Sequence, residues 1–365
     1  ELPAAVVTEE KPLGRILTVN RAAQSAGVRP GMRYASALSV CPHLRAGVVH
    51  REEREELKEE LVEVLRRFTP EVEPSSMDAA LFWVNAAGLE RLVEHILGGG
   101  VHGVFILGTT GEAPSLSHRL RCELIERTCE QVAGRIPVLV GITDTSFIES
   151  VNVAYRAQAA GADAVVLAPP YYFPAGQPEL LEYLEHIAAE LPLPLFLYNM
   201  PSMTKLMFEP ETVRAAADLP GVVGLKDSSA NMIYFHQLQT LLRDRQDFSL
   251  LIGPEQLLAE TILMGGHGGV CGGANIAPSL YVDLYRAATE KDLAAVEYLH
   301  REVMQINETI YSVGKYMSSY LKGIKCALWY MDICDDFMAE PFHRFRTEER
   351  AIIEGHLKEL RIAEV

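Results

Sequence analysis

Long apolar runs are missing from the sequence, which excludes an ordinary membrane-spanning helix. No stretch approaches the roughly 20 consecutive apolar residues that such a span needs. Residues 1–30 also lack the basic stretch and sustained apolar core that mark a secretory signal peptide. We therefore expect a cytoplasmic protein that does not associate with a membrane.

Cysteine motifs and positive charge are scarce as well. The six cysteines form no Cys-x-x-Cys pair, which indicates reduced thiols rather than a disulfide framework. No cluster of histidine, cysteine and carboxylate residues has zinc spacing, so we expect no metal.

The 33 lysines and arginines are outnumbered by 49 aspartates and glutamates, which gives a net charge of −16. Binding to nucleic acid is not expected, because it relies on a basic surface.

What the sequence does contain is a regular alternation of helical segments and short apolar runs from about residue 86 onward. Continuous apolar runs are typical of strands that are buried on both faces, and hence of a parallel sheet. An open doubly wound sheet would normally carry a glycine-rich dinucleotide loop, and none is found. The repeat favours a (β/α)8 TIM barrel, with helices from Pro278 to the end. The predicted strands are 103–107, 137–141, 164–168, 194–198, 222–226, 249–253 and 269–271.

One of these strands ends in Lys226, and the preceding strand ends in Tyr198, 28 residues earlier. Burial would favour the neutral, nucleophilic form of the Lys226 amine, which is what Schiff-base chemistry requires. Two consecutive βα units would bring the Tyr198 phenol next to it as a proton shuttle. The alternatives are a lysine that extends to solvent and a core tyrosine with a satisfied hydroxyl.

Three other strand ends carry polar or aromatic motifs. Gly108-Thr109-Thr110-Gly111-Glu112 offers hydroxyls and backbone N–H groups to a small carboxylate, or forms an ordinary βα loop. Pro170-Tyr171-Tyr172 and Gly269-Val270-Cys271 follow two more strands. A later run, Tyr311 to Met331, is rich in aromatic residues and methionine, which we interpret as core or subunit interface.

From about residue 86 to 360, these motifs together resemble the dihydrodipicolinate synthase / N-acetylneuraminate lyase family of class I pyruvate aldolases. The resemblance rests on G-T-T-G-E, P-Y-Y, Y-N-x-P, G-x-K-D and G-G-x-x-x-x-A-N, in that order and at the expected spacing. It implies a Schiff-base-forming lyase that acts on pyruvate or a pyruvate-derived 2-keto acid and needs no cofactor. It also implies a homo-oligomer, a tetramer built from tight dimers.

The resemblance assigns catalytic roles to four residues. Lys226 would form the imine with the keto carbon of pyruvate. Tyr198 would move protons to and from that centre. Thr109 would link Tyr198 to Tyr172 in a proton relay, and in this family the second tyrosine reaches in from the neighbouring subunit.

Two further positions would bind substrate, and two others depart from the family pattern. Thr110 would hold the pyruvate carboxylate, and the Val270 carbonyl would line the pocket.

Met203 stands where dihydrodipicolinate synthases have an arginine for the second substrate's carboxylate, and methionine cannot make that contact. Gly253-Pro254-Glu255-Gln256 differs from the Gly-x-Asp-Glu motif of the sialic acid lyases. We therefore expect another 2-keto acid aldolase or dehydratase. The alternatives are a 4-hydroxy-tetrahydrodipicolinate synthase proper and an inactive fusion product with a broken barrel.

Residues 1–78 have a different character and resemble the fingers and part of the palm of Y-family DNA polymerases. In that family a catalytic Ser-x-Asp-Glu motif would fall on Ser76, Asp78 and Ala79, and the glutamate is absent. One carboxylate cannot assemble a two-metal site, so we expect a non-catalytic fragment that binds no DNA. A charged helix over about 51–67 would be its longest element.

The domain boundaries follow from these observations. We expect the polymerase-like fragment over 1–78, the aldolase barrel over 79–296 and a C-terminal helical region over 297–365. No equivalent of the family's first strand, with its Thr-Pro-Phe ending, is found. We expect either 79–84 or 68–76 to take its place, because an open parallel sheet leaves unpaired backbone groups.

Overall fold

The computed structural model describes residues 2–7, 14–48, 73–74, 82–83 and 87–362, and the chain divides into two units. The smaller unit comprises 1–67 and 72–83, and the larger comprises 68–71 and 84–365. Within the described residues, no helix is long and apolar enough to cross a membrane.

The smaller unit contains a three-stranded sheet and two short helices. The strand β1 (Ala4–Val7) lies between β2 (Ile16–Val19), which is antiparallel to it, and β3 (Arg45–Gly47), which is parallel. The helices are α1 (Arg21–Ser25) and α2 (Tyr34–Val40).

Several features predicted for this part of the chain lie outside the described residues. They are the helix over 51–67 and the positions Ser76, Asp78 and Ala79.

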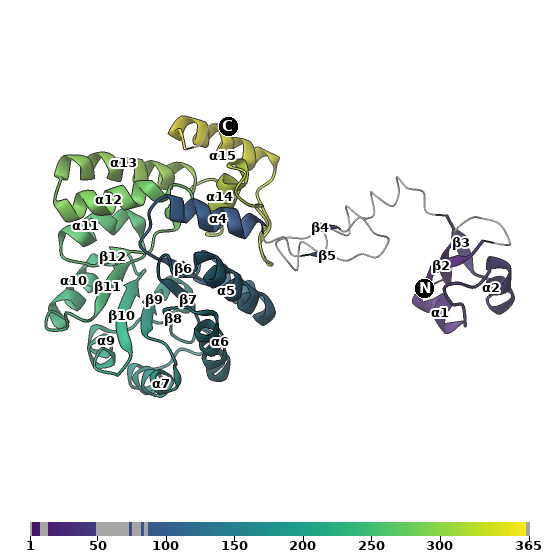
Figure 1. The fold of residues 1–365 in the computed structure, drawn as a ribbon, viewed down its shortest axis with the longest axis horizontal. Coiled ribbons are helices and arrows are strands. Elements are labelled where there is room, and N and C mark those ends of the chain that lie inside the picture. The colour runs from purple at the N-terminus through teal and green to yellow at the C-terminus, as the bar shows by residue number, and fades with distance from the viewer. Residues whose placement is uncertain (1, 8–13, 49–72, 75–81, 84–86, 363–365) are drawn as a thin grey trace. The chain divides into compact units, whose positions relative to one another are not determined.

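The larger unit is built on a parallel sheet of seven strands, in which neighbours in space also follow each other in the chain (Figure 1). The apolar runs become strands because both of their faces are covered, and all four residues of β8 are buried. The sheet curls into the half-barrel of a (β/α)8 fold, as the sequence predicted. The strands are β6 (Val104–Ile106), β7 (Val138–Gly141), β8 (Ala164–Leu167), β9 (Leu195–Asn199), β10 (Val222–Asp227), β11 (Ser249–Ile252) and β12 (Gly268–Gly269).

Helices connect the strands and surround the sheet (Figure 1). Their apolar faces pack on strand residues such as Val140, Val165, Leu197 and Leu225, which are fully buried in one core. The helices up to the last strand are α4 (Ala87–Gly98), α5 (His118–Val132), α6 (Phe147–Ala160), α7 (Gln177–Glu190), α8 (Pro201–Thr204), α9 (Pro210–Ala216), α10 (Met232–Leu241) and α11 (Leu258–Leu263).

The C-terminal region is helical, although not continuously so as the sequence suggested. Its helices are α12 (Pro278–Glu290), α13 (Leu293–Thr309), α14 (Ser319–Tyr330) and α15 (Thr347–Leu360). The loop after α13 contains Gly314 at φ +106°, a backbone conformation that favours glycine, and residues 331–346 form a second non-helical segment. The helices pack around a second core that includes Ile306, Ile324 and Leu357.

The expected replacement for the first barrel strand is not found among the described residues. The strands β4 (Glu73–Pro74) and β5 (Phe82–Trp83) pair with each other in an antiparallel ribbon, and neither belongs to the seven-stranded sheet. A short connection favours this arrangement, because parallel pairing needs a crossover of a dozen or more residues. Proline also lacks the N–H that a central strand must donate. The four described residues of 68–76 and 79–84 thus do not extend the seven-stranded sheet, and the other residues of these two stretches lie outside the described part of the chain.

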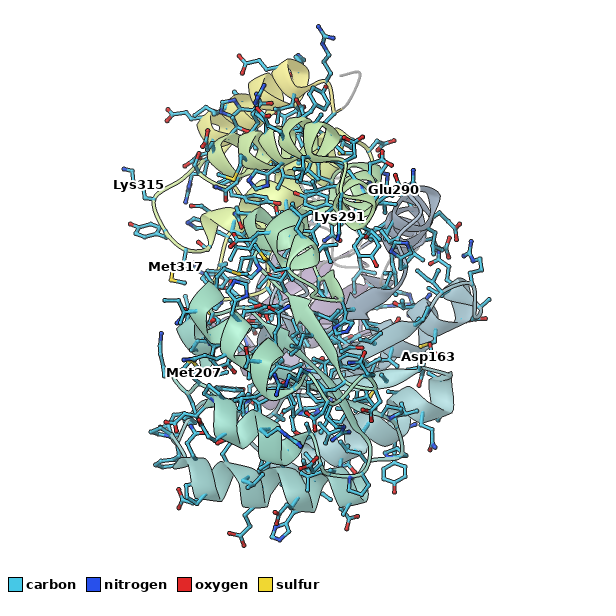
Figure 2. The ribbon with its side chains drawn as sticks, turned by 90° about the vertical axis from the view of Figure 1, so that its left-hand side faces the viewer. Asp163, Met207, Glu290, Lys291, Lys315 and Met317 are labelled. Atoms are coloured by element: carbon cyan, nitrogen blue, oxygen red, sulfur yellow. The ribbon has the colours of Figure 1, made fainter. Side chains whose placement is uncertain are left out.

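Figure 2 identifies the two ends of the strands through its labelled residues. Asp163 directly precedes β8, Met207 follows β9, and the two lie on opposite sides of the view. Lys315 and Met317, from the loop between α13 and α14, lie on the side of Met207. This loop therefore lies on the side of the strands' carboxyl ends, where barrels of this type carry their chemistry.

We predict that a chain beginning at Val84 folds without the smaller unit, because the larger unit has its own cores. Its melting temperature should stay within about 3 °C of the barrel transition of the full chain, which corresponds to ~1 kcal/mol for a domain of this size. Scanning calorimetry on both chains tests this. Aggregation of the shorter chain, or loss of its cooperative transition, would contradict the prediction.

Candidate active site

The carboxyl ends of β9 and β10 carry a phenol and an amine side by side. The two strands pair in parallel, with Lys226 opposite Tyr198 and Asp227 opposite Asn199. Because side chains alternate along a strand, Tyr198 and Lys226 share one face of the sheet. The Lys226 Nζ lies 4.3 Å from the centroid of the Tyr198 ring, and Lys226 is only 8% exposed.

The surroundings of the Lys226 amine are largely aromatic and aliphatic. Its Nζ lies 5.0 Å from the centroid of the Phe105 ring, and that ring meets the Tyr198 ring edge-on. Val166 and Ala168, from the end of β8, are buried in the same cluster. Such surroundings supply few hydrogen-bond partners that would compete with a carbonyl substrate for the amine.

The Tyr198 hydroxyl is hydrogen-bonded to Thr109, and its acidity is changed by its neighbours. The distance from Thr109 Oγ1 to the Tyr198 hydroxyl is 3.1 Å. Burial raises the pKa of the phenol, but the Lys226 charge and the hydrogen bonds of Thr109 and Ser228 outweigh it, so that the pKa is below its usual value. A phenol of lowered pKa transfers its proton more readily near neutral pH.

On the opposite face of the same two strands, a buried polar pair holds their register. The Asn199 Nδ2 donates to Asp227 Oδ1 at 2.8 Å, and the Ser229 hydroxyl donates to Asp227 Oδ2 at 2.8 Å. The Phe208 N–H donates to Asn199 Oδ1 at 3.2 Å. Burial raises the pKa of the Asp227 carboxyl, while the hydrogen bonds from Asn199 and Ser229 oppose that effect. Asn199 and Asp227 directly follow Tyr198 and Lys226, so the pair fixes where both of those side chains lie.

The loop Gly108–Glu112 is anchored to the C-terminal region through its last residue. Glu112 adopts a left-handed backbone conformation with φ +51°, and its N–H donates to the Thr109 carbonyl at 3.1 Å. Its buried carboxylate forms an ion pair with Lys325 of α14 and accepts the Ala339 N–H at 3.1 Å. Contacts with residues more than 200 positions away thus anchor the end of the loop that carries Thr109 and Thr110.

The remaining residues singled out from the sequence lie in different surroundings. The Thr110 Oγ1 lies 3.4 Å from the Tyr320 hydroxyl, beyond a good hydrogen-bond length. Val270 directly follows β12, and its N–H donates to a carbonyl of β11. Tyr172 is 77% exposed, with its ring edge-on to Phe173, so within one chain it is not part of the buried Thr109–Tyr198 pair.

The structure also reveals contacts near the site that sequence reasoning did not predict. Glu255, in the short helix η2 (Glu255–Leu257), is buried and bonded to Tyr281 and Tyr311. The sequence showed Glu255 only as part of a motif that differs from that of the sialic acid lyases. Lys325 and Tyr320 reach the same region from α14. The signal for Tyr311, Tyr320 and Lys325 was the aromatic run 311–331, whose spacing does not show which barrel loop it meets. No group of His, Cys, Asp and Glu among the described residues is arranged to hold a metal ion.

Comparison with known families identifies two matches along the chain. The sequence model of the Dihydrodipicolinate synthetase family matches residues 75–360, which is more than half of the chain. The sequence model of the impB/mucB/samB family matches residues 1–148.

Individual relatives agree with the first of these matches. The probable 2-dehydro-3-deoxy-D-pentonate aldolase YjhH of Escherichia coli K12 is 36% identical over 64% of this chain and 78% of its own. The structure of dihydrodipicolinate synthase from Bacteroides thetaiotaomicron is 54% identical, with a TM-score of 0.74 over 80% of this chain and 97% of that chain. The structure of YagE from E. coli K12 in complex with pyruvate is 27% identical, with a TM-score of 0.73 over 81% and 99% of the two chains.

Proposed function

The chain belongs to the dihydrodipicolinate synthetase family and is a class I pyruvate-dependent lyase, and we propose that Lys226 is the amine that forms its imine. The observation that carries this proposal is the pairing of the buried Lys226 amine with the Tyr198 phenol at adjacent strand ends. Lysine forms Schiff bases with carbonyl substrates when its amine is held next to a group that moves protons.

In this mechanism, the Lys226 amine attacks the keto carbon of the substrate and gives a carbinolamine. Tyr198 carries a proton to the departing hydroxyl, water leaves, and a protonated imine remains. The positive nitrogen accepts the electron pair when a carbon–carbon bond breaks or a methyl proton leaves, which gives an enamine. Thr109, whose Oγ1 lies 3.1 Å from the Tyr198 hydroxyl, would pass the proton onward.

The carboxylate of the substrate would lie on the loop Gly108–Glu112. Thr110 supplies a hydroxyl there, and the Val270 carbonyl after β12 would line the opposite wall. The anchoring of Glu112 to Lys325 and Ala339 supports this assignment, because a rigid loop binds with little loss of conformational freedom.

We predict that pyruvate and borohydride together add one reduced adduct, and that mass spectrometry of a digest locates it on Lys226. The Lys226→Arg variant keeps the charge, cannot form the imine and should gain no adduct. The exposed Lys205 in the same digest serves as an internal control. An adduct on another lysine, or none in folded wild-type protein, would refute the assignment.

For the substrate, we propose a sugar-derived 2-keto acid in preference to aspartate semialdehyde. Met203, on α8 after the Tyr198 strand, is 46% exposed and offers no charge to a second carboxylate. The aldolase name of YjhH supports this proposal. The second candidate is 4-hydroxy-tetrahydrodipicolinate synthesis, which the 54% identity to the Bacteroides thetaiotaomicron enzyme favours.

Introducing the missing charge distinguishes the two substrates. The Met203→Arg variant should raise kcat/KM for aspartate semialdehyde with pyruvate about 10-fold or more, since a charged hydrogen bond contributes ~1.5–3 kcal/mol. Met203→Leu, which conserves size and lacks charge, should leave it unchanged. Equal kcat/KM of the wild-type protein for the semialdehyde and for cleavage of a 2-keto-3-deoxy sugar acid would contradict the proposed preference.

We also propose that Tyr172 acts in the site of a second copy of the chain, within a tetramer of tight dimers. Tyr172 and Phe173 are 77% and 80% exposed, and Tyr171 beside them is 37% exposed. Adjacent exposed aromatic residues are typical of association surfaces. A partner's Tyr172 could then reach Thr109 and complete the relay, which the chain's own Tyr172 does not do.

Mixing two inactive variants tests this sharing. Lys226→Ala and Tyr172→Phe chains, unfolded and refolded together, should recover about a quarter of wild-type activity, because half of the dimers are mixed and each holds one intact site. Lys226→Ala mixed with Tyr198→Phe is the matched control and should recover nothing, since both residues lie in one chain's site. Equal recovery in the two mixtures would refute the shared relay.

A further inference from the structure

Two tyrosines donate to one buried carboxylate near the carboxyl ends of β11 and β12, and a third tyrosine packs against one of them. The hydroxyls of Tyr281, on α12, and Tyr311 donate to Glu255 Oε1 at 2.8 Å and 2.6 Å. The Gly273 N–H donates to Glu255 Oε2 at 2.8 Å. The third tyrosine, Tyr320 of α14, packs edge-on against Tyr311 with ring centroids 4.7 Å apart.

The backbone next to this cluster leaves room for the hydroxyls because it consists of two glycines. A Cβ at Gly272 would overlap the Tyr320 hydroxyl, and a Cβ at Gly273 would overlap the Tyr281 hydroxyl. Both glycines lie in the short helix η3 (Gly272–Asn275), which follows Val270. The position of the Tyr320 hydroxyl is therefore set by close packing on both sides.

The Tyr320 hydroxyl faces the loop that would hold the substrate carboxylate. It lies 3.4 Å from Thr110 Oγ1, close enough for one carboxylate to accept from both and too far for a strong bond between them. Burial, and next the charge of Glu255, raise the pKa of the Tyr320 phenol, so it remains a protonated donor at neutral pH. No such role follows from the family motifs, all of which lie within the barrel.

We propose that the Tyr320 hydroxyl is a second donor, beside Thr110, to the carboxylate of the 2-keto acid substrate. Glu255 and Tyr311 act as positioning residues: Glu255 holds the Tyr311 ring, against which Tyr320 packs. This inference rests on the proposed function and adds to it a residue that strengthens the selection of keto acids over neutral ketones.

The test compares a charged and a neutral ketone in the borohydride trapping reaction at Lys226. In the Tyr320→Phe variant, the half-saturating concentration of pyruvate should rise about 10-fold, the effect of losing one hydrogen bond to a charged group, while the maximal trapping rate stays the same. The half-saturating concentration of methyl pyruvate, which has no carboxylate, should not change. Tyr316→Phe, at a 77% exposed tyrosine just before α14, is the control and should match the wild type for both ketones.

A second variant tests the positioning part. Tyr311→Phe keeps the ring but loses the hydrogen bond to Glu255, so it should show a smaller rise for pyruvate alone. If Tyr320→Phe fails to fold, the pyruvate result of Tyr311→Phe still tests the inference.

Three outcomes would count against the inference. An equal loss for both ketones would mean a structural role, and no change for pyruvate would mean no contact. Either result overturns only this inference, because wild-type protein would still be trapped at Lys226. Absence of an adduct in wild-type protein would instead overturn the proposed function itself.

Discussion

The site depends on the parallel, in-register pairing of β9 and β10. This one register places Tyr198 beside Lys226 on the inner face and Asn199 against Asp227 on the other. A slip by one residue would exchange the two faces and bury an amide and a carboxylate where the proposed reaction needs a phenol and an amine. Burying Asp227 is costly, and the hydrogen bonds from Asn199 and Ser229 offset that cost only in the correct register. The polar pair thus holds the reactive pair in place.

A second constraint connects the C-terminal helices to the barrel through two buried carboxylates. Glu112 binds Lys325 of α14, and Glu255 binds Tyr281 and Tyr311. Each carboxylate follows a barrel strand, so the contacts fix the loops that surround the proposed substrate site. A buried carboxylate whose partner is removed becomes strongly destabilising. The helices after α12 therefore act as part of the site and not only as a cover for the barrel.

The half-barrel shows how local connection length decides which strands pair. Residues 73–74 and 82–83 are near neighbours in the chain and form an antiparallel ribbon with each other. The seven strands of the larger unit are separated by helices, and every one of them joins the parallel sheet. The missing family ending indicated that the first strand is atypical, but the sequence did not predict that residues 73–74 and 82–83 pair with each other.

The sequence by itself determined the barrel, because continuous apolar runs between helices have few other ways to cover both faces. It also predicted that Lys226, Tyr198, Thr109 and Thr110 lie at one edge of the sheet, since parallel strands that are consecutive in the chain end at one edge. Only the tertiary structure decided that Glu112 meets Lys325 and that Tyr320 meets Thr110, contacts between residues 213 and 210 positions apart. Helical periodicity shows which face of α14 is apolar. It does not show which barrel loop that face contacts, because this contact depends on how the C-terminal helices pack against the barrel.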